Sequence, residues 1–92
     1  MAEIRVERPS REVLEEMGVF DWPLWEKGAS RFPWTYGEKE VCYLTEGRVT
    51  VEPESGEPVT FGAGDLVTFP AGMNCTWEIH EPVRKHYRLG EE

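Results

Sequence analysis

Residues 61–87 read FGAGDLVTFPAGMNCTWEIHEPVRKHY, and this stretch decides the fold class. Two short apolar segments, 66–69 and 74–80, are separated by turn-forming residues that cluster at 62–65 and at 71–72. Glycine, proline and aspartate adopt the backbone angles that tight turns need. Strands of this length between such turns are typical of an antiparallel all-β domain, so we expect a sheet here.

The same alternation of short apolar segments and turns extends through most of the chain. We expect strands at residues 23–27, 31–36, 40–45, 48–52, 58–61, 66–69, 74–80 and 83–89. Further turns are expected at Glu46-Gly47 and at residues 54–56. A sheet of many short strands must close or double over to protect its edges, which favours a jelly-roll barrel.

The N-terminal part differs from the rest because it contains the one helical pattern. Residues 1–8 alternate apolar and charged side chains, as a half-buried strand does. Ser10 is then a suitable N-cap and Gly18 a suitable C-terminal stop. Between them lies an apolar stripe at helical spacing, formed by Val13, Leu14 and Met17. We therefore predict one short helix ahead of the sheet.

Length and charge exclude several classes of protein. The 92 residues suffice for one domain, which we take as residues 1–92. A formal charge of -8 would repel nucleic acid, so no nucleic-acid partner is expected. No apolar run approaches the roughly 18 residues of a membrane helix, and no signal-peptide pattern opens the chain. We expect a cytoplasmic protein with no membrane partner, in which Cys42 and Cys75 are free thiols.

Two segments carry the spacing of a known pair of motifs. The first motif is G-x5-H-x-H-x3-4-E-x6-G, and its positions fall on Gly28, Trp34, Tyr36, Glu40 and Gly47. The second is G-x5-P-x-G-x2-H-x3-N, and its positions fall on Gly64, Pro70, Gly72, Cys75 and Ile79. The glycines, the proline and Glu40 agree with the motifs. The three histidines are replaced by Trp34, Tyr36 and Cys75, and the asparagine is replaced by Ile79.

These are the motifs of the cupin superfamily, and the chain resembles the small single-domain cupins of the ureidoglycine aminohydrolase-like (DUF861) group. The resemblance spans nearly the whole chain and implies a small cupin barrel, a double-stranded β-helix of jelly-roll type, with one short N-terminal helix. Members of the wider group include a manganese-dependent ureidoglycine aminohydrolase and an ethanolamine-utilisation cupin. Typical cupins bind a divalent metal through three histidines and one glutamate, and they place these side chains inside the barrel.

Strand alternation predicts which side chains face the interior. Cys75, Trp77 and Ile79 share an apolar face, so His80 should point to solvent. In the last strand Val83, Tyr87 and Leu89 set the inner face, which also places Lys85 inside. The predicted internal set is Trp34, Tyr36, Glu40, Cys42, Cys75, Trp77, Lys85 and Tyr87. Trp22 and Trp25 are expected to fill the core.

An inward glutamate and lysine need an explanation, because an unpaired buried charge is costly. One interpretation is a structural ion pair between Glu40 and Lys85 near the barrel mouth. A second is a site in which both groups act on a polar ligand, with Glu40 and Lys85 as the catalytic residues. In that site Trp34, Tyr36, Cys42, Cys75, Trp77 and Tyr87 would bind the ligand. A slipped register that turns Lys85 outward is the third.

A metal cofactor is not assured, because most of the expected ligands are replaced. Glu40 and Cys75 are weak candidates for a divalent metal, and Cys42 lies two residues from Glu40. The alternatives for both cysteines are a small core side chain or a nucleophile activated by Lys85.

Three functions remain open at this point. The chain can be an enzyme acting on a small nitrogenous compound, with Glu40 as acid, base or anchor. It can be a domain that binds a small polar molecule without metal or catalysis. It can also be a structural protein that forms a homodimer through a strand edge.

Overall fold

The computed structural model describes residues 3–90, which form seven strands, one α-helix and one 3-10 helix. In chain order the elements are β1 (Arg5–Glu7), α1 (Arg11–Met17), η1 (Val19–Asp21), β2 (Leu24–Lys27), β3 (Ser30–Thr35), β4 (Glu40–Pro53), β5 (Val59–Gly62), β6 (Leu66–Phe69) and β7 (Asn74–Leu89). The predicted all-β architecture with one short helix is confirmed. Residues 1–2 of the predicted first strand lie outside the described residues.

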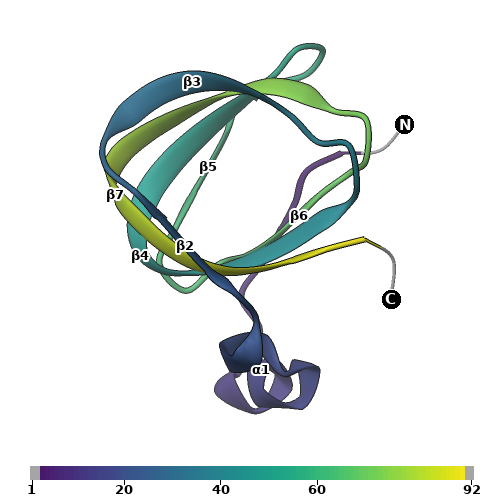
Figure 1. The fold of residues 1–92 in the computed structure, drawn as a ribbon, viewed down its shortest axis with the longest axis vertical. Coiled ribbons are helices and arrows are strands. Elements are labelled where there is room, and N and C mark those ends of the chain that lie inside the picture. The colour runs from purple at the N-terminus through teal and green to yellow at the C-terminus, as the bar shows by residue number, and fades with distance from the viewer. Residues whose placement is uncertain (1–2, 91–92) are drawn as a thin grey trace.

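All seven strands belong to one antiparallel sheet that curls around a common interior. The order β1-β6-β4-β7-β2 forms the main path, while β3 pairs with β7 and β5 pairs with β4. Figure 1 shows the strands curving round this interior, with α1 outside them. Among residues 3–90 no helix has both the length and the apolar character needed to cross a membrane.

Two strands are longer than the sequence predicts, because predicted breaks are bends within continuous strands. β4 has 14 residues and runs through the expected turn at Glu46-Gly47. The β4–β7 register shifts between Leu44 and Val49, which marks bulges at this bend. Gly47 has a φ of 107° there, and a Cβ on it would lie 2.5 Å from the carbonyl oxygen of Pro82. The prediction of a turn at Gly47 is therefore wrong, and the glycine permits a bulge instead.

The bends let β4 and β7 each serve two partners. The first half of β4 pairs with β6, and its second half pairs with β5. β7 pairs with β3 through residues 74–79 and with β2 through residues 83–86. The two long strands also pair with each other from Glu40 to Pro53. β4 and β7 consequently connect β5 and β6 on one side to β2 and β3 on the other.

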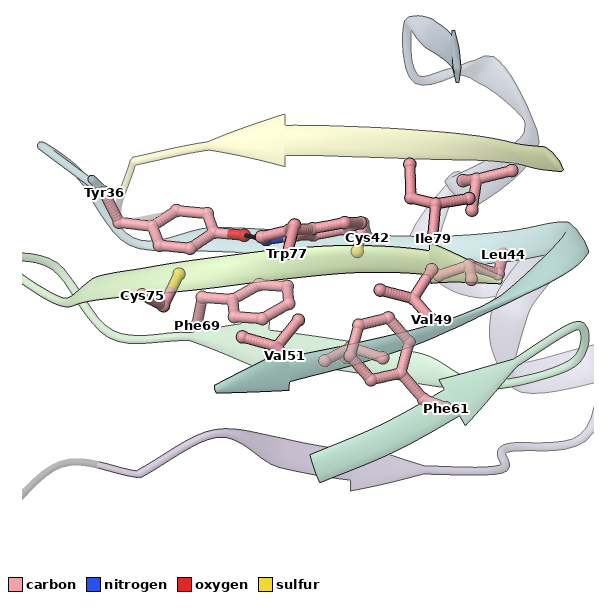
Figure 2. Packing of buried hydrophobic residues seen from close by; sticks show 12 residues of the cluster. Tyr36, Cys42, Leu44, Val49, Val51, Phe61, Phe69, Cys75, Trp77 and Ile79 are labelled. Carbon is pink, nitrogen blue, oxygen red and sulfur yellow. Dashed lines mark hydrogen bonds between the residues drawn. The ribbon is translucent and has the colours of Figure 1, made fainter. Parts of the chain in front are cut away.

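The interior contains a core of aliphatic and aromatic side chains, which Figure 2 shows between the strands. Its buried members are Tyr36, Cys42, Leu44, Val49, Val51, Phe61, Val67, Phe69, Cys75, Trp77, Ile79 and Val83. The Tyr36 and Phe69 rings stack with centroids 4.6 Å apart, and Phe69 also contacts Trp77. The predicted inward face of Cys75, Trp77 and Ile79 is confirmed, and His80 is exposed as expected.

The helix packs on the outside of the sheet and not on this core. Ser10 caps it by accepting a hydrogen bond from the Val13 backbone N–H, and Gly18 ends it with a φ of 74°. Leu14 forms a second apolar cluster with Val19, Val41 and Leu66. Val13 was expected in the buried stripe but is 42% exposed, because it faces away from the strands.

Candidate functional site

One cavity opens into the rolled sheet at the end where the chain's aromatic residues gather. Its volume is about 210 Å³. Its lining residues are Trp25, Phe32, Trp34, Tyr36, Glu40, Trp77, Lys85, Tyr87 and Leu89. Trp34 and Leu89 are nearly half exposed and form its mouth, whereas Glu40 and Lys85 are 6% and 5% exposed and lie at its inner end. The cavity therefore has apolar walls and a charged inner end.

Glu40 and Lys85 form a buried ion pair at that inner end. The Lys85 ammonium donates to Glu40 Oε2 at 2.7 Å. The two residues lie on neighbouring strands, since Lys85 is opposite Leu44 in the β4–β7 ladder. Their side chains extend toward each other along the strands and meet inside. The register with Lys85 turned outward is thus excluded, and both charges face the interior as strand alternation predicts.

Two tryptophan rings complete the surroundings of the Lys85 ammonium. Its Nζ lies 4.8 Å from the ring centroid of Trp25 and 4.6 Å from that of Trp77. The planes of the two indoles meet at 71°, so the ammonium occupies the corner between them. Cation–π contacts of this kind attract an ammonium group and replace part of the hydration that burial removes. The pair is therefore a carboxylate and an ammonium held in a fixed arrangement.

Tyr36 adds a polar group beside this pair. Its hydroxyl accepts a hydrogen bond from Trp77 Nε1 at 2.9 Å, the contact drawn in Figure 2. Burial raises the pKa of Tyr36 well above its usual range, and the neighbouring Glu40 raises it further. Tyr36 consequently stays a neutral phenol whose own O–H remains a donor. The partly buried Tyr87 brings a second phenol to the wall.

The two cysteines were expected among the ligand-binding residues, but neither lies in the cavity wall. Cys42 is fully buried beside Glu40 and Lys85. Burial raises the pKa of Cys42 to about 12, an effect that Lys85 opposes and Glu40 reinforces. Cys75 donates its S–H to the Trp34 carbonyl at 3.5 Å, and burial raises its pKa to about 11. Both side chains are protonated thiols at neutral pH, which suits core packing and not nucleophilic attack.

The donor set does not fit a cupin metal. Within residues 3–90 no three His, Cys, Asp or Glu side chains gather as metal ligands would. Glu40 keeps the motif's acidic position, but its carboxylate is directed to the Lys85 ammonium. A divalent cation on that carboxylate would lie beside an existing positive charge and would be repelled. Trp34 and Tyr36 stand at two of the histidine positions and offer no nitrogen ligand.

The cavity also contains residues that sequence reasoning missed or placed elsewhere. Trp34 has the predicted orientation, but it lies at the mouth and is 47% exposed. Trp25 packs against the core cluster as expected, but it also forms part of the cavity wall, where its ring meets that of Trp77 edge to face. Phe32 was not singled out, although it shares the parity of Trp34 and Tyr36. The strand alternation that selected those two residues identifies Phe32 as well.

Solved structures of related proteins show the same fold. A DUF861 family protein from Thermotoga maritima is 49% identical, with a TM-score of 0.93, over 95% of this chain and 99% of that one. A DUF861 family protein of unknown function from Pseudomonas syringae is 30% identical, with a TM-score of 0.65, over 72% of this chain and 28% of that one.

A EutQ protein from Clostridium difficile shares the fold with a TM-score of 0.66 at 22% identity. That match covers 73% of this chain and 52% of the EutQ protein, so the chain corresponds to about half of it. No curated protein matches the chain. The sequence pattern of one family extends over residues 14–87, from the helix through most of β7, and the chain therefore belongs to the EutQ-like cupin domain family.

Proposed function

We propose that this protein binds a small, neutral, nitrogen-containing molecule in the barrel cavity, without a metal ion. The observation that carries the proposal is the buried Glu40–Lys85 pair at the inner end of an aromatic cavity. A polar pair in this position is costly to bury and gives a ligand both a donor and an acceptor.

The chemistry of the ligand follows from the charges around the pair. Lys85 and Glu40 neutralise each other, so neither an anion nor a cation gains a full opposite charge there. The Lys85 ammonium has N–H donors beyond the one given to Glu40 Oε2, and a carboxylate has lone pairs for more than one donor. An amide or ureido group has a carbonyl that accepts from Lys85 and an N–H that donates to Glu40. This group matches both sides of the pair.

The walls and the volume set the size and shape of the ligand. Rings of Trp25, Phe32 and Trp77 provide flat apolar surfaces, on which a planar group packs well. A volume of about 210 Å³ corresponds to roughly seven water molecules at about 30 Å³ each. A compact molecule of similar size fits, and a nucleotide or sugar chain does not.

The proposal departs from the aminohydrolase reaction that the wider group suggests. That reaction depends on manganese, and the side chains at the metal-ligand positions do not fit a metal here. Glu40 and Lys85 are accordingly assigned to binding and orienting the nitrogenous ligand. We propose a binding domain and not a metal-dependent hydrolase.

Three phenyl compounds of similar size test this assignment. Benzamide, benzoate and benzylammonium carry a neutral, a negative and a positive polar group on the same ring. NMR titration of the ¹⁵N-labelled protein in EDTA should show benzamide binding tightest, with shifts concentrated at the cavity residues. The double variant E40Q/K85M should lose about 10-fold or more of this affinity, since charge-assisted hydrogen bonds contribute about 1.5–3 kcal/mol.

A surface variant supplies the matched control. Arg31 forms exposed ion pairs with Glu52 and Glu78 on the outside of the sheet. The variant R31A should bind benzamide as the parent protein does. Tighter binding of benzoate or benzylammonium than of benzamide would contradict the proposed ligand class, and so would shifts concentrated outside the cavity.

A further inference from the structure

Lys85 is held in a cage that has the chemistry of an organic-ammonium binding site. Such sites combine aromatic faces with a carboxylate, because both attract a positive charge that is poorly hydrated. The cage here consists of the Trp25 and Trp77 rings, 4.8 and 4.6 Å from Nζ, and of Glu40 Oε2 at 2.7 Å. The cation that fills it is a side chain of the same protein.

We infer that Lys85 determines the specificity of the cavity by filling this cation cage from within. The Lys85 ammonium already occupies the cage and pairs with Glu40, so an external amine or metal ion finds no unpaired carboxylate at the inner end. A ligand instead meets N–H donors at a fixed position. Lys85 thereby converts a cavity that would select cations into one that selects hydrogen-bond acceptors.

The strand pairing explains why Lys85 stays in the cage. Trp25 lies directly opposite Lys85 in the β2–β7 ladder, and Leu44 lies opposite it in the β4–β7 ladder. The aliphatic part of the lysine is thus covered on both sides, and its 5% exposure leaves little room for another rotamer. Trp77 belongs to β7 itself, so one strand provides both the cation and one wall.

Chemical rescue tests the inference directly. K85A retains Cβ and removes Cγ, Cδ, Cε and Nζ, which together correspond to n-propylammonium. We expect n-propylammonium, at constant ionic strength, to raise the melting temperature of K85A and to leave that of the parent protein unchanged. It should bind K85A about 10-fold or more tightly than 1-propanol, its neutral counterpart, because the difference lies in the ion pair and the cation–π contacts.

Two comparisons separate a cage from a mere cavity. K85A/E40Q and K85A/W25L should each lose most of the rescue by n-propylammonium. Mn²⁺ and Zn²⁺ should stabilise K85A less than the amine does, since the indole faces offer no ligand to a metal. Equal binding of 1-propanol and n-propylammonium, undiminished rescue in K85A/E40Q, or tighter binding of a metal ion would overturn the inference.

A measurement on the unaltered protein covers the case in which K85A does not fold. The chain has only three lysines, Lys27, Lys39 and Lys85, so their ammonium NMR signals are readily assigned. A caged Lys85 should show slow proton exchange and an upfield shift from the two indole rings, relative to a lysine in a short unstructured peptide. An Lys85 signal that matches the peptide lysine in both respects would refute the cage.

The inference concerns the cavity of the proposed function but can fail independently of it. Loss of amine rescue with intact benzamide binding would remove the cage and leave the proposed ligand class. Amine rescue without benzamide binding would support the cage and contradict the proposed ligand class.

Discussion

The strongest prediction concerns the free energy of unfolding when the buried pair is broken one side at a time. E40Q leaves the Lys85 ammonium without its carboxylate, and K85M leaves Glu40 without its cation. The double variant E40Q/K85M removes both charges with little change in volume. The structure allows a large effect because both residues are more than nine-tenths buried, at 6% and 5% exposure.

The expected size follows from the distance and the burial. At 2.7 Å and an effective dielectric constant of about 20, the attraction is about 6 kcal/mol. Each single variant should lose about 3–5 kcal/mol, the usual cost of an uncompensated buried charge. The double variant should remain within about 2 kcal/mol of the parent protein, because the cost of desolvating both ions disappears together with their attraction. The coupling energy should consequently be of the order of 6 kcal/mol.

Urea unfolding followed by tryptophan fluorescence measures these differences. Urea is uncharged and leaves electrostatic interactions unscreened. With a slope of about 1.3 kcal/mol per molar urea, a loss of about 4 kcal/mol lowers the midpoint by about 3 M. The matched control is the exposed pair of Arg31 and Glu78, whose nitrogen and oxygen lie 3.2 Å apart. E78Q should cost less than about 1 kcal/mol, as is usual for surface pairs.

Additive effects of E40Q and K85M on the free energy of unfolding would refute the proposed coupling between the two charges. If E40Q and K85M each cost less than about 1 kcal/mol and their effects sum in the double variant, the pair is not energetically coupled. The charges would then be solvated in the folded protein, and the inner end of the cavity would not hold the buried ion pair described above.

Three further predictions concern the bend, the thiols and the wall. G47A should lose about 2 kcal/mol or more of unfolding free energy, because the new Cβ would clash with backbone atoms of Pro82 and Val83. G72A is the control and should lose less, since no atom lies within 4 Å of a Cβ at that position. The midpoints of urea unfolding compare the two variants. Cys42 has its pKa raised from 9.0 to about 12, so the native thiol keeps a proton that the unfolded chain releases above pH 9. Stability should therefore fall by about 1.4 kcal/mol per pH unit from this group between pH 9 and 12, and urea titrations across that range should lack this component in C42V. W25L should bind benzamide about 5-fold or more weakly, while W22L, on the outer cluster, should not; a W22L defect of equal size would argue against the cavity as the site.

Strand alternation alone predicted much of the interior, because the period of two is a local property of the chain. It placed Glu40 and Lys85 inside, and the burial of both confirms this. The pairing of Glu40 with Lys85 was one of three possibilities at that stage. The choice among them depends on the β4–β7 register, which a single sequence does not specify.

The role of Trp25 and the bulge at Gly47 could not be predicted from the sequence, because both depend on long-range contacts. Trp25 forms a cavity wall only because β2 pairs with the second half of β7, and nothing near Trp25 in the sequence indicates that neighbour. At Gly47 the signals for a turn and for a bulge are identical, since both use a glycine with positive φ. The outcome there depends on Pro82, 35 residues further on, against which the backbone packs. Self-association and a cytoplasmic location stay predictions.

The arrangement of β4 and β7 has a consequence for how this protein diversifies. The caged lysine and its acid sit on the two strands that also carry most of the core, so altering one of them demands a compensating change in the other. Trp25 and Phe32, by contrast, project from the short strands β2 and β3 at the margin of the sheet. We therefore expect relatives with other ligand preferences to differ at the positions of Trp25 and Phe32 and to keep the Glu40–Lys85 ion pair.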